Sequence, residues 1–167
     1  MKVRRAKNED IEKILDLLVQ VDMVHHNGRP DIFKGPVTKY NAAQLEEIIA
    51  DDNRPVFVCE DDNGLVLGHA FCIHEQVLNH AVLTDIKTLY IDDICVDDGA
   101  RGKGVGKMLY EFVKEYAKEK GFYNITLNVW ECNPTAMKFY ESMGLKPQKI
   151  GMETISGLTG STETQMS

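Results

Sequence analysis

Arg101-Gly102-Lys103-Gly104-Val105-Gly106 is the stretch of this 167-residue sequence that decides its fold. It follows an apolar run at residues 89–96 that is typical of a strand. It also opens a helix of about sixteen residues, in which apolar side chains recur at i, i+3, i+4 and i+7. A strand, a glycine-rich turn and an immediate helix form the arrangement in which backbone N–H groups bind phosphate oxygens. The stretch therefore predicts a site for a phosphate-bearing ligand at the start of the helix.

The spacing of this turn excludes two common phosphate-binding patterns. The Walker pattern needs a glycine where Arg101 stands and a Ser or Thr where Met108 stands. The dinucleotide pattern needs the rhythm G-x-G-x-x-G, whereas the glycines here alternate with single residues. Glycine still lets the backbone approach a pyrophosphate, and the basic residues of the turn add positive charge. These basic residues are Arg101, Lys103 and Lys107.

The rest of the chain predicts a mixed α/β fold, with a central twisted sheet and helices on both faces. Strands are expected at residues 3–6, 55–60, 65–77, 89–96, 124–131 and 147–155. Helices are expected after Asn8, after Asn41 with Gln44 as its reciprocal capping partner, and after Asn133 with Pro134 at the first position. Residues 23–40 are expected to be irregular. We expect a single domain over residues 1–156 and a polar tail over 157–167.

Composition narrows the class of protein. The net charge of −7 argues against nucleic-acid binding and weakly favours a cationic partner. Neither a signal peptide nor an apolar run long enough for a membrane span is apparent, so we expect a cytoplasmic protein without a membrane partner. The four cysteines, Cys59, Cys72, Cys95 and Cys132, lack metal-ligand spacing, so we expect reduced thiols and no metal.

Two motifs resemble those of the GNAT acetyltransferase superfamily. The first is its pyrophosphate loop, Arg/Gln-x-x-Gly-x-Gly/Ala, and the second is Asn-x-x-Ala-x-x-Phe-Tyr-x-x-x-Gly-Phe. The matching residues are Arg101, Gly104 and Gly106, then Asn133, Ala136, Phe139, Tyr140 and Gly144, with Leu145 in place of the final Phe. The resemblance is close over residues 88–147. It implies acetyl-CoA as co-substrate, an amine acceptor and a sheet of about six or seven strands.

The resemblance also assigns roles to individual residues. The loop Arg101, Gly102, Lys103, Gly104, Val105, Gly106 and Lys107 would hold the pyrophosphate. Ile94, Cys95 and Val96 would pair with the pantetheine arm from a strand that diverges from its neighbour, with the Ile94 N–H facing the thioester oxygen. Asn133 and Tyr140 lie seven positions apart on one helix and share roughly one face. Tyr140 would bind the coenzyme and donate a proton to the departing sulfur.

The proton acceptor for the amine is left open by the sequence. Asp92 and Asp93 are the candidates, and in a regular strand only one of them could face the site. Asp92 is preferred because Asp92-Asp93 resembles the Glu-Asp pair of spermidine/spermine-type members of the family. Asp93 as a structural residue, or proton loss through water, are the alternatives. The histidines, His69 among them, are expected to be solvated or hydrogen-bonded rather than catalytic.

The identity of the acceptor is likewise open. A small cationic amine, an antibiotic amine and a protein N-terminus or lysine all remain possible acceptors. The oligomeric state is also open, and a homodimer is possible because family members often form one. One rival interpretation is a non-catalytic acyl-CoA-binding module. Another is an acyltransferase for longer chains.

Overall fold

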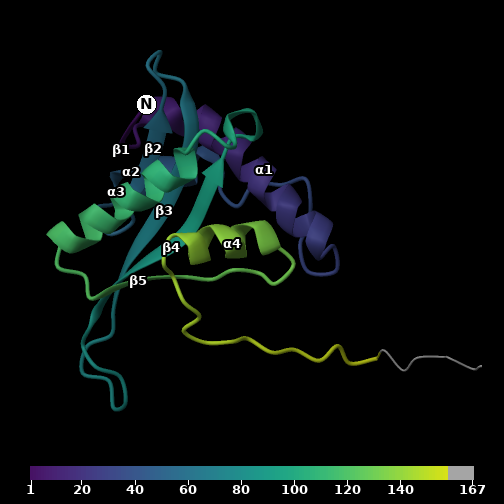
Figure 1. Ribbon diagram of the computed structural model, residues 1–167, viewed down its shortest axis with the longest axis vertical. Helices are drawn as coiled ribbons and strands as arrows, with labels where there is room; N and C mark the ends of the chain where they lie inside the picture. Colours follow the sequence, from purple (N-terminus) through teal and green to yellow (C-terminus); the bar gives the residue numbers. More distant parts are fainter. Residues whose placement is uncertain (158–167) are drawn as a thin grey trace, which may run out of the picture.

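The computed structural model describes residues 1–157, and five strands form one sheet at its centre (Figure 1). The strands are β1 (Lys2–Arg5), β2 (Val56–Glu60), β3 (Val66–Gln76), β4 (Lys87–Val96) and β5 (Asn124–Leu127). They lie in the order β1-β2-β3-β4-β5, with antiparallel pairs up to β4 and a parallel pair β4–β5. The predicted mixed sheet is confirmed.

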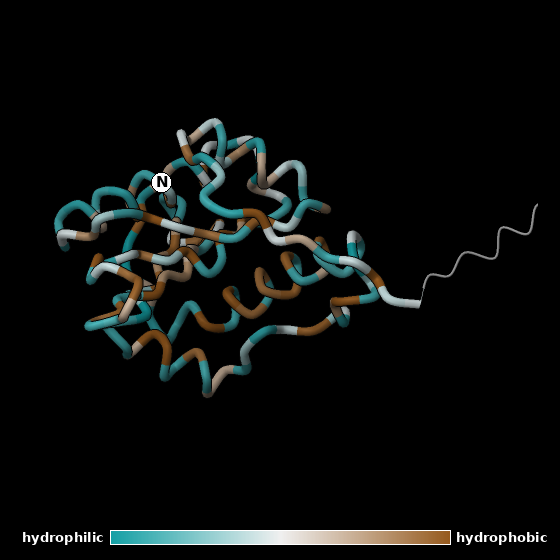
Figure 2. The backbone as a smooth tube through the Cα atoms, turned by 90° about the horizontal axis from the view of Figure 1, so that it is seen from below, coloured by the Kyte–Doolittle hydropathy of each residue, from teal (hydrophilic) through white to brown (hydrophobic). Residues whose placement is uncertain are grey.

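Helices cover both faces of the sheet, as expected. They are α1 (Ile11–Gly28), α2 (Ala42–Ala50), α3 (Val105–Glu119) and α4 (Pro134–Ser142). A hydrophobic core lies on each face of the sheet, and alternate residues of β2 point into one or the other. Val56 and Val58 pack with α1 and α2, whereas Phe57 and Cys59 pack with α3. In Figure 2, brown apolar and teal polar residues alternate along the helical coils, as expected for helices that turn one apolar face toward the sheet.

Local sequence signals place the helix ends. Asn41 accepts a hydrogen bond from the Gln44 N–H at 2.9 Å, and the Gln44 side chain accepts one from the Asn41 N–H, so the predicted capping box is confirmed. Asn133 accepts from the Ala136 N–H at 3.2 Å, directly before Pro134. Asn8 is not a cap, because the Asp10 carboxylate holds the Lys7 N–H at the start of a 3-10 turn over Asn8–Asp10.

A close approach at Gly68 sets the position of α3 on the sheet. A Cβ at this glycine would lie 2.7 Å from the Cys95 carbonyl oxygen and 3.0 Å from Val105 Cγ1. No residue other than glycine fits there without displacing β4 or the first turn of α3. Gly68 therefore helps to place the glycine-rich turn over the end of β4.

Three predictions about elements are wrong. Helix α1 continues to Gly28, although residues 23–40 were expected to be an irregular surface segment with one helical turn at most. Strand β5 ends at Leu127 rather than residue 131, and beyond it Trp130 packs edge-on against Phe33 in the segment after α1, with ring centroids 4.9 Å apart. Residues 147–155 form no strand: they run as an extended segment past the end of α1, where Arg29 pairs with Glu153, without a neighbouring strand to pair with (Figure 1). The sheet therefore has five strands among residues 1–157 instead of six or seven.

The predicted tail at 157–167 lies almost wholly outside the described residues. Among residues 1–157, none of the helices combines the length and apolar character that crossing a bilayer requires.

Candidate active site

The glycine-rich turn forms an open cradle at the N-terminus of α3. Gly102 and Gly104 have φ angles of +75° and +81°, and a Cβ at either would meet no atom within 4 Å. The first hydrogen bond of the helix runs from the Met108 N–H to the Gly104 carbonyl at 3.0 Å. The N–H groups of residues 105–107 precede this bond and have no backbone acceptor in the described chain. Free N–H groups beside an open space form a site for phosphate oxygens.

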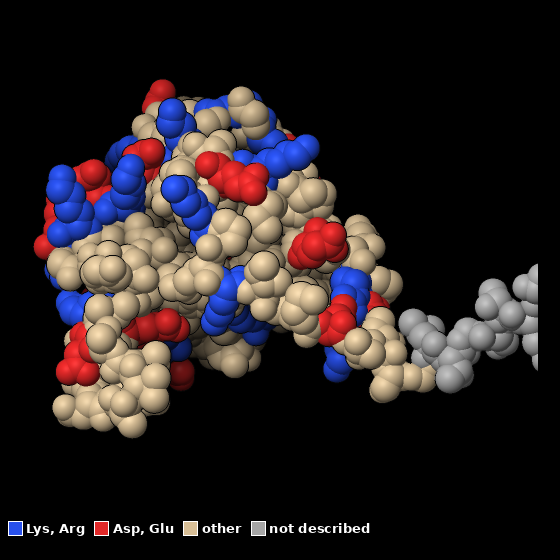
Figure 3. Space-filling model, turned by 60° about the horizontal axis from the view of Figure 1, so that its bottom comes forward, with Lys and Arg blue, Asp and Glu red and all other residues tan. Residues whose placement is uncertain are grey.

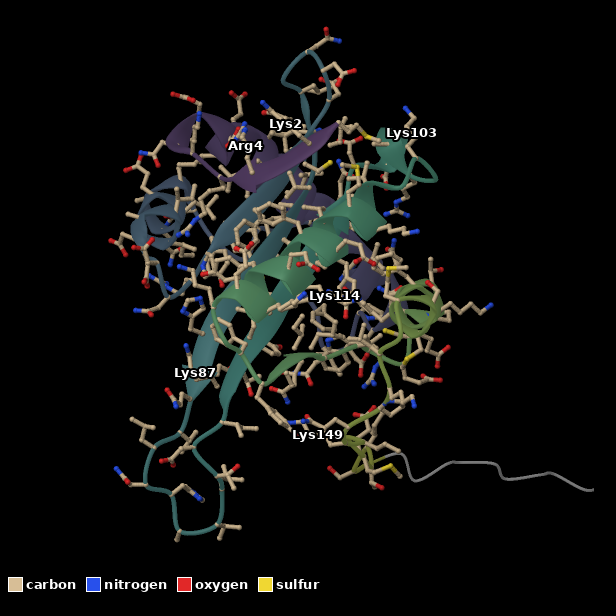
Figure 4. All side chains as sticks on the ribbon, turned by 60° about the vertical axis from the view of Figure 1, so that its left-hand side comes forward. Lys2, Arg4, Lys87, Lys103, Lys114 and Lys149 are labelled. Atoms are coloured by element: carbon tan, nitrogen blue, oxygen red, sulfur yellow. The ribbon has the colours of Figure 1, made fainter. Side chains whose placement is uncertain are left out.

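Basic side chains surround this cradle. Lys103 extends from the loop away from the body (Figure 4), and Lys107 is exposed in the first turn of α3. Neither pairs with a carboxylate of residues 1–157. Arg101 pairs with Asp98 at 2.9 Å. On the face drawn in Figure 3, acidic and basic side chains are interspersed. Lys103 and Lys107, which pair with no carboxylate of residues 1–157, therefore give the cradle its local positive charge.

The second motif meets the first through a contact between α3 and α4. A Cβ at Gly106 would lie 3.3 Å from Phe139 Cζ and 3.6 Å from Val96 Cγ2. The absence of a side chain at Gly106 thus allows α4 to approach both the helix start and the end of β4. This contact brings the neighbouring Tyr140 toward β4.

Strand β4 diverges from β5 at this place, as the sequence predicted. Their pairing covers only Thr88 to Ile91 of β4 and ends at the pair Ile91–Leu127. The edge of β4 from Asp92 to Val96 that faces away from β3 has no strand partner among the described residues. An extended ligand can therefore add to this edge by main-chain hydrogen bonds.

A bulge directs both aspartates to one face of the sheet. Asp93 pairs with Phe71 and Ile91 with Cys72, which leaves Asp92 as an extra residue on β4. The expectation that only one of them could face the site applied to a regular strand, and the bulge means that β4 is not regular here. Both carboxylates lie on the side of α1 and α2, and each has its own partner.

Asp92 is held by the segment before α2. Its carboxylate accepts hydrogen bonds from Lys39 Nζ at 2.5 Å and from the Tyr40 hydroxyl at 3.4 Å. The Asp92 side chain is only 14% exposed, whereas half of the Lys39 side chain is in contact with solvent. The pKa of the Lys39 ammonium is affected first by burial, which lowers it, but the contact with Asp92 outweighs this and raises it overall. Lys39 therefore stays charged on Asp92.

Asp93 has a different partner. His69 on β3, whose side chain is fully buried, lies with Nε2 2.7 Å from Asp93 Oδ2. The sequence offered one signal for this contact: His69 is a titratable residue in the middle of an apolar strand. Such a residue needs a hydrogen-bond partner when buried. The expectation that His69 is hydrogen-bonded is confirmed for one of its two ring nitrogens.

Tyr140 lies within the electrostatic reach of Asp93. Burial raises the pKa of its phenol well above the ordinary value, and the negative charge of Asp93 raises it further. Burial also raises the pKa of the nearby Cys95 thiol to about 12. The neighbourhood of Tyr140 therefore favours neutral phenols and neutral thiols over their anions.

The side chains of three other predicted site residues are already engaged within the protein. Asn133 uses its side-chain oxygen as the cap of α4. The Cys95 thiol donates to the Leu17 carbonyl at 3.3 Å on the α1 face, so only its backbone is available at the open edge. Val105 is buried, and it too can contribute only its backbone N–H. Sequence reasoning missed Lys39 and Tyr40 because their contact with Asp92 spans more than 50 residues.

Comparison with known proteins identifies the fold family. Residues 5–145 match the sequence pattern of the Acetyltransferase (GNAT) family. The chain belongs to this family.

Relatives within the family differ in what they act on. A probable glucosamine 6-phosphate N-acetyltransferase of Drosophila melanogaster is 30% identical over 146 residues, which cover 86% of this chain and 60% of that protein. A peptidyl-lysine N-acetyltransferase of Salmonella typhimurium is 26% identical over 86% of this chain and 82% of its own. This chain thus spans less than two thirds of the Drosophila relative.

A solved structure resembles the whole described fold. A Bacillus halodurans protein, crystallised as a mutant, superposes with a TM-score of 0.89 at 30% identity, covering 93% of this chain and 99% of that one. The family, the cradle and the diverging strand all suit a ligand that has phosphate groups and an extended arm.

Proposed function

We propose that this protein is an N-acetyltransferase that transfers the acetyl group of acetyl-CoA to a primary amine. The observation that carries the proposal is the combination of the phosphate cradle at residues 101–107 with the open edge of β4 beside Tyr140. The cradle suits the pyrophosphate of coenzyme A, and the open edge suits its pantetheine arm. The residues present therefore fit this co-substrate.

The proposed reaction is a direct attack on the thioester. The acceptor ammonium gives its proton to Asp92, Asp93 or water, and the neutral amine nitrogen forms a bond to the thioester carbon. An N–H of the open edge, at Ile94 by family resemblance, stabilises the oxyanion. The C–S bond then breaks, and the sulfur leaves as a thiolate that accepts a hydrogen bond from Tyr140. Tyr140 gives its proton to the sulfur as the new amide nitrogen gives up its second proton, which restores the phenol.

The pKa values around Tyr140 bear on the last step. With ordinary values of about 10 for tyrosine and about 8.5 for a thiol, the thiolate would be too weak a base to take the proton fully. Burial raises the pKa of Tyr140, so the phenol holds its proton more tightly than in water. Tyr140 therefore stabilises the thiolate by a hydrogen bond as it forms, and passes its proton on only as the amide nitrogen replaces it.

We further propose that the acceptor is cationic. Two carboxylates on one face, in a chain of net charge −7, favour an ammonium group. The names of the relatives cover an amino sugar phosphate and protein lysines. Asp92 already binds one ammonium group, that of Lys39. We therefore propose that the ammonium group of an exposed peptide lysine or of a small polyamine can bind there as well.

One experiment separates the enzyme from a non-catalytic coenzyme-binding module. The protein is incubated with acetyl-CoA and a panel of amines, and release of free thiol is followed. Longer acyl-CoA thioesters in parallel test the acyltransferase for longer chains. Tyr140→Phe is the test variant, and Tyr123→Phe, at a tyrosine that is 75% exposed, is the matched control. Binding of acetyl-CoA without turnover by any amine would favour the module.

We also propose a homodimer and a cytoplasmic location. The extended C-terminal segment exposes Ile150 and Met152, and the protruding β3–β4 hairpin exposes Val82 and forms the lower-left lobe of Figure 3. Burial of these side chains against a second copy would remove apolar surface from water. Sedimentation equilibrium tests this, with Met152→Asp expected to shift the dimer toward monomer. The four free cysteines suit a reducing compartment, which imaging of the tagged protein would test.

A further inference from the structure

His69 is a buried histidine with one bonded and one unbonded ring nitrogen. Its Nε2 lies 2.7 Å from Asp93 Oδ2, and its Nδ1 is buried with no hydrogen-bond partner in residues 1–157. The ring packs edge-on against Phe71, with centroids 4.9 Å apart, so it is confined on the α1 face of β3. Among the described side chains, His69 alone holds Asp93 by a hydrogen bond.

The two nitrogens define which proton His69 carries. Asp93 as a carboxylate only accepts hydrogen bonds, so the proton lies on Nε2 and is donated to Asp93. Nδ1 then bears only a lone pair. A second proton on Nδ1 would place an N–H in the core without an acceptor, which is the less favourable arrangement. His69 is therefore a fixed donor to Asp93.

The two aspartates of the bulge are consequently not equivalent. Asp92 is engaged by both Lys39 and Tyr40. Asp93 has one side-chain partner among the described residues, His69 on Oδ2, and its side chain is 15% exposed. Its Oδ1 is left without a side-chain partner in that part of the chain, in the neighbourhood of Tyr140, where the thioester is expected.

We propose that His69 is a positioning residue, which holds Asp93 so that its free oxygen receives the proton of the acceptor amine. This inference rests on the proposed acetyltransferase function and names Asp93 as its base. The proton passes from the acceptor nitrogen to Asp93 Oδ1, while the proton on His69 Nε2 stays in place. No oxidation or reduction is involved. Asp92, in this scheme, binds cations and does not take the proton.

The test compares three substitutions at His69. His69→Leu removes the donor, and His69→Asn places its amide near Nδ1, out of reach of Asp93. His69→Gln places an amide N–H near the position of Nε2 and restores the donor without an imidazole. His74→Leu is the matched control, because His74 lies on the same strand and its Nε2 bonds to the Tyr116 hydroxyl at 2.9 Å, away from the aspartates.

We expect the substitutions at His69 to change kcat for the amine but not the affinity for acetyl-CoA. His69→Leu and His69→Asn should lower kcat for the amine by about 10- to 100-fold, since a positioned base contributes about 10²- to 10⁴-fold. His69→Gln should recover kcat to within about threefold, with an unchanged shape of the pH–rate profile. The Kd for acetyl-CoA should stay within about twofold in all three, because none touches the cradle. His74→Leu should leave kcat unchanged.

Three results would overturn the inference. Unchanged kcat in folded His69→Leu or His69→Asn would show that Asp93 does not need its partner. A pH–rate profile that loses one limb in His69→Gln would show that the imidazole itself moves the proton. Equal losses in His69→Gln and His69→Asn would point to packing rather than donation. In each case the wild type still turns over, so the proposed function stands, whereas a wild type without turnover removes both.

Discussion

Gly104→Ala tests whether the cradle binds phosphate, separately from the need for a glycine in the left-handed backbone conformation at this position. Gly104 is the N-cap of α3 with φ +81°, and no atom lies within 4 Å of the position that an alanine methyl group would take. Gly64, in the β2–β3 turn, also has φ +81° and open space around it. Gly64→Ala is therefore a matched control with the same backbone conformation, far along the chain from the cradle.

The structure gives the size of both effects. Alanine in the left-handed region costs about 1–2 kcal/mol, and neither substitution creates a clash. Both variants should thus lose about 2–8 °C in Tm, at about 2–4 °C per kcal/mol for a chain of this size. Only at Gly104 does the methyl group stand where the phosphates approach the free N–H groups. Loss of one charge-assisted hydrogen bond, about 1.5–3 kcal/mol, raises Kd about 10- to 100-fold.

The assay is calorimetric titration of each variant with coenzyme A, alongside thermal unfolding. Gly104→Ala should bind at least tenfold more weakly, and Gly64→Ala should bind as the wild type does. Equal Kd values for the two variants, or wild-type affinity in Gly104→Ala, would refute the assignment of the cradle to the pyrophosphate.

Three other predictions concern the acid, the acceptor and the fold. Tyr140→Phe should lower kcat about 10- to 100-fold with little change in acetyl-CoA affinity. In the wild type, burial and then Asp93 raise the pKa of Tyr140, so the phenol should stay protonated. The wild-type kcat should therefore show no decline from this group up to about pH 10. Lys39→Met should lower KM for a diamine severalfold, because the ammonium no longer has to displace Lys39 from Asp92. Arg4→Met should lower the free energy of unfolding by about 1.5–3 kcal/mol, measured by urea titration, since its guanidinium bonds to Glu60 at 2.7 Å and to the buried Asp10 at 2.8 and 3.0 Å.

Each of these has a control. Steady kcat in Tyr140→Phe, or a decline of wild-type kcat by about pH 9 that Tyr140→Phe lacks, would contradict the role of the phenol. Lys39→Arg keeps the charge and should leave KM near the wild-type value, so equal KM values for Lys39→Met and Lys39→Arg would argue against displacement. Lys2→Met removes an ion pair to Glu60 from a lysine that is 72% exposed and should cost less than about 1 kcal/mol. A Lys2→Met loss as large as that of Arg4→Met would show that burial of the Arg4 contact is not what gives it its strength.

The Arg4 contact also predicts the response to acid. Hydrogen bonds from Arg4 and then Lys2 lower the pKa of Glu60, so the folded state binds fewer protons than the unfolded state. The resulting stabilisation is present above the ordinary glutamate pKa of about 4.3 and is lost as the pH falls through the lower, folded value.

Local signals account for the parts of the fold that the sequence predicted well. The glycine turn, the apolar stripe of α3 and the caps at Asn41 and Asn133 depend on residues within one or two turns of each other. Such signals can be read without knowing the partner elements. The cradle residues were predicted for the same reason.

Non-local contacts account for the failures. The bulge at Asp92 depends on how β4 aligns with β3, and alternation along one strand cannot reveal it. Beyond the end of β5, Trp130 packs against Phe33, nearly 100 residues earlier. The expected strand at 147–155 had the right apolar pattern but no neighbour within residues 1–157. His69 was visible as a polar residue in an apolar strand, yet its partner was not.

The most direct test of the central claim measures two products at once. Wild-type protein is incubated with acetyl-CoA and a diamine, and free thiol and N-acetylated amine are quantified over time by absorbance and mass spectrometry. The account predicts that both accumulate one to one at a rate proportional to enzyme, and that Tyr140→Phe, which still binds acetyl-CoA, slows both equally. Thiol release without an acetylated amine, for this or any other acceptor tried, would contradict it.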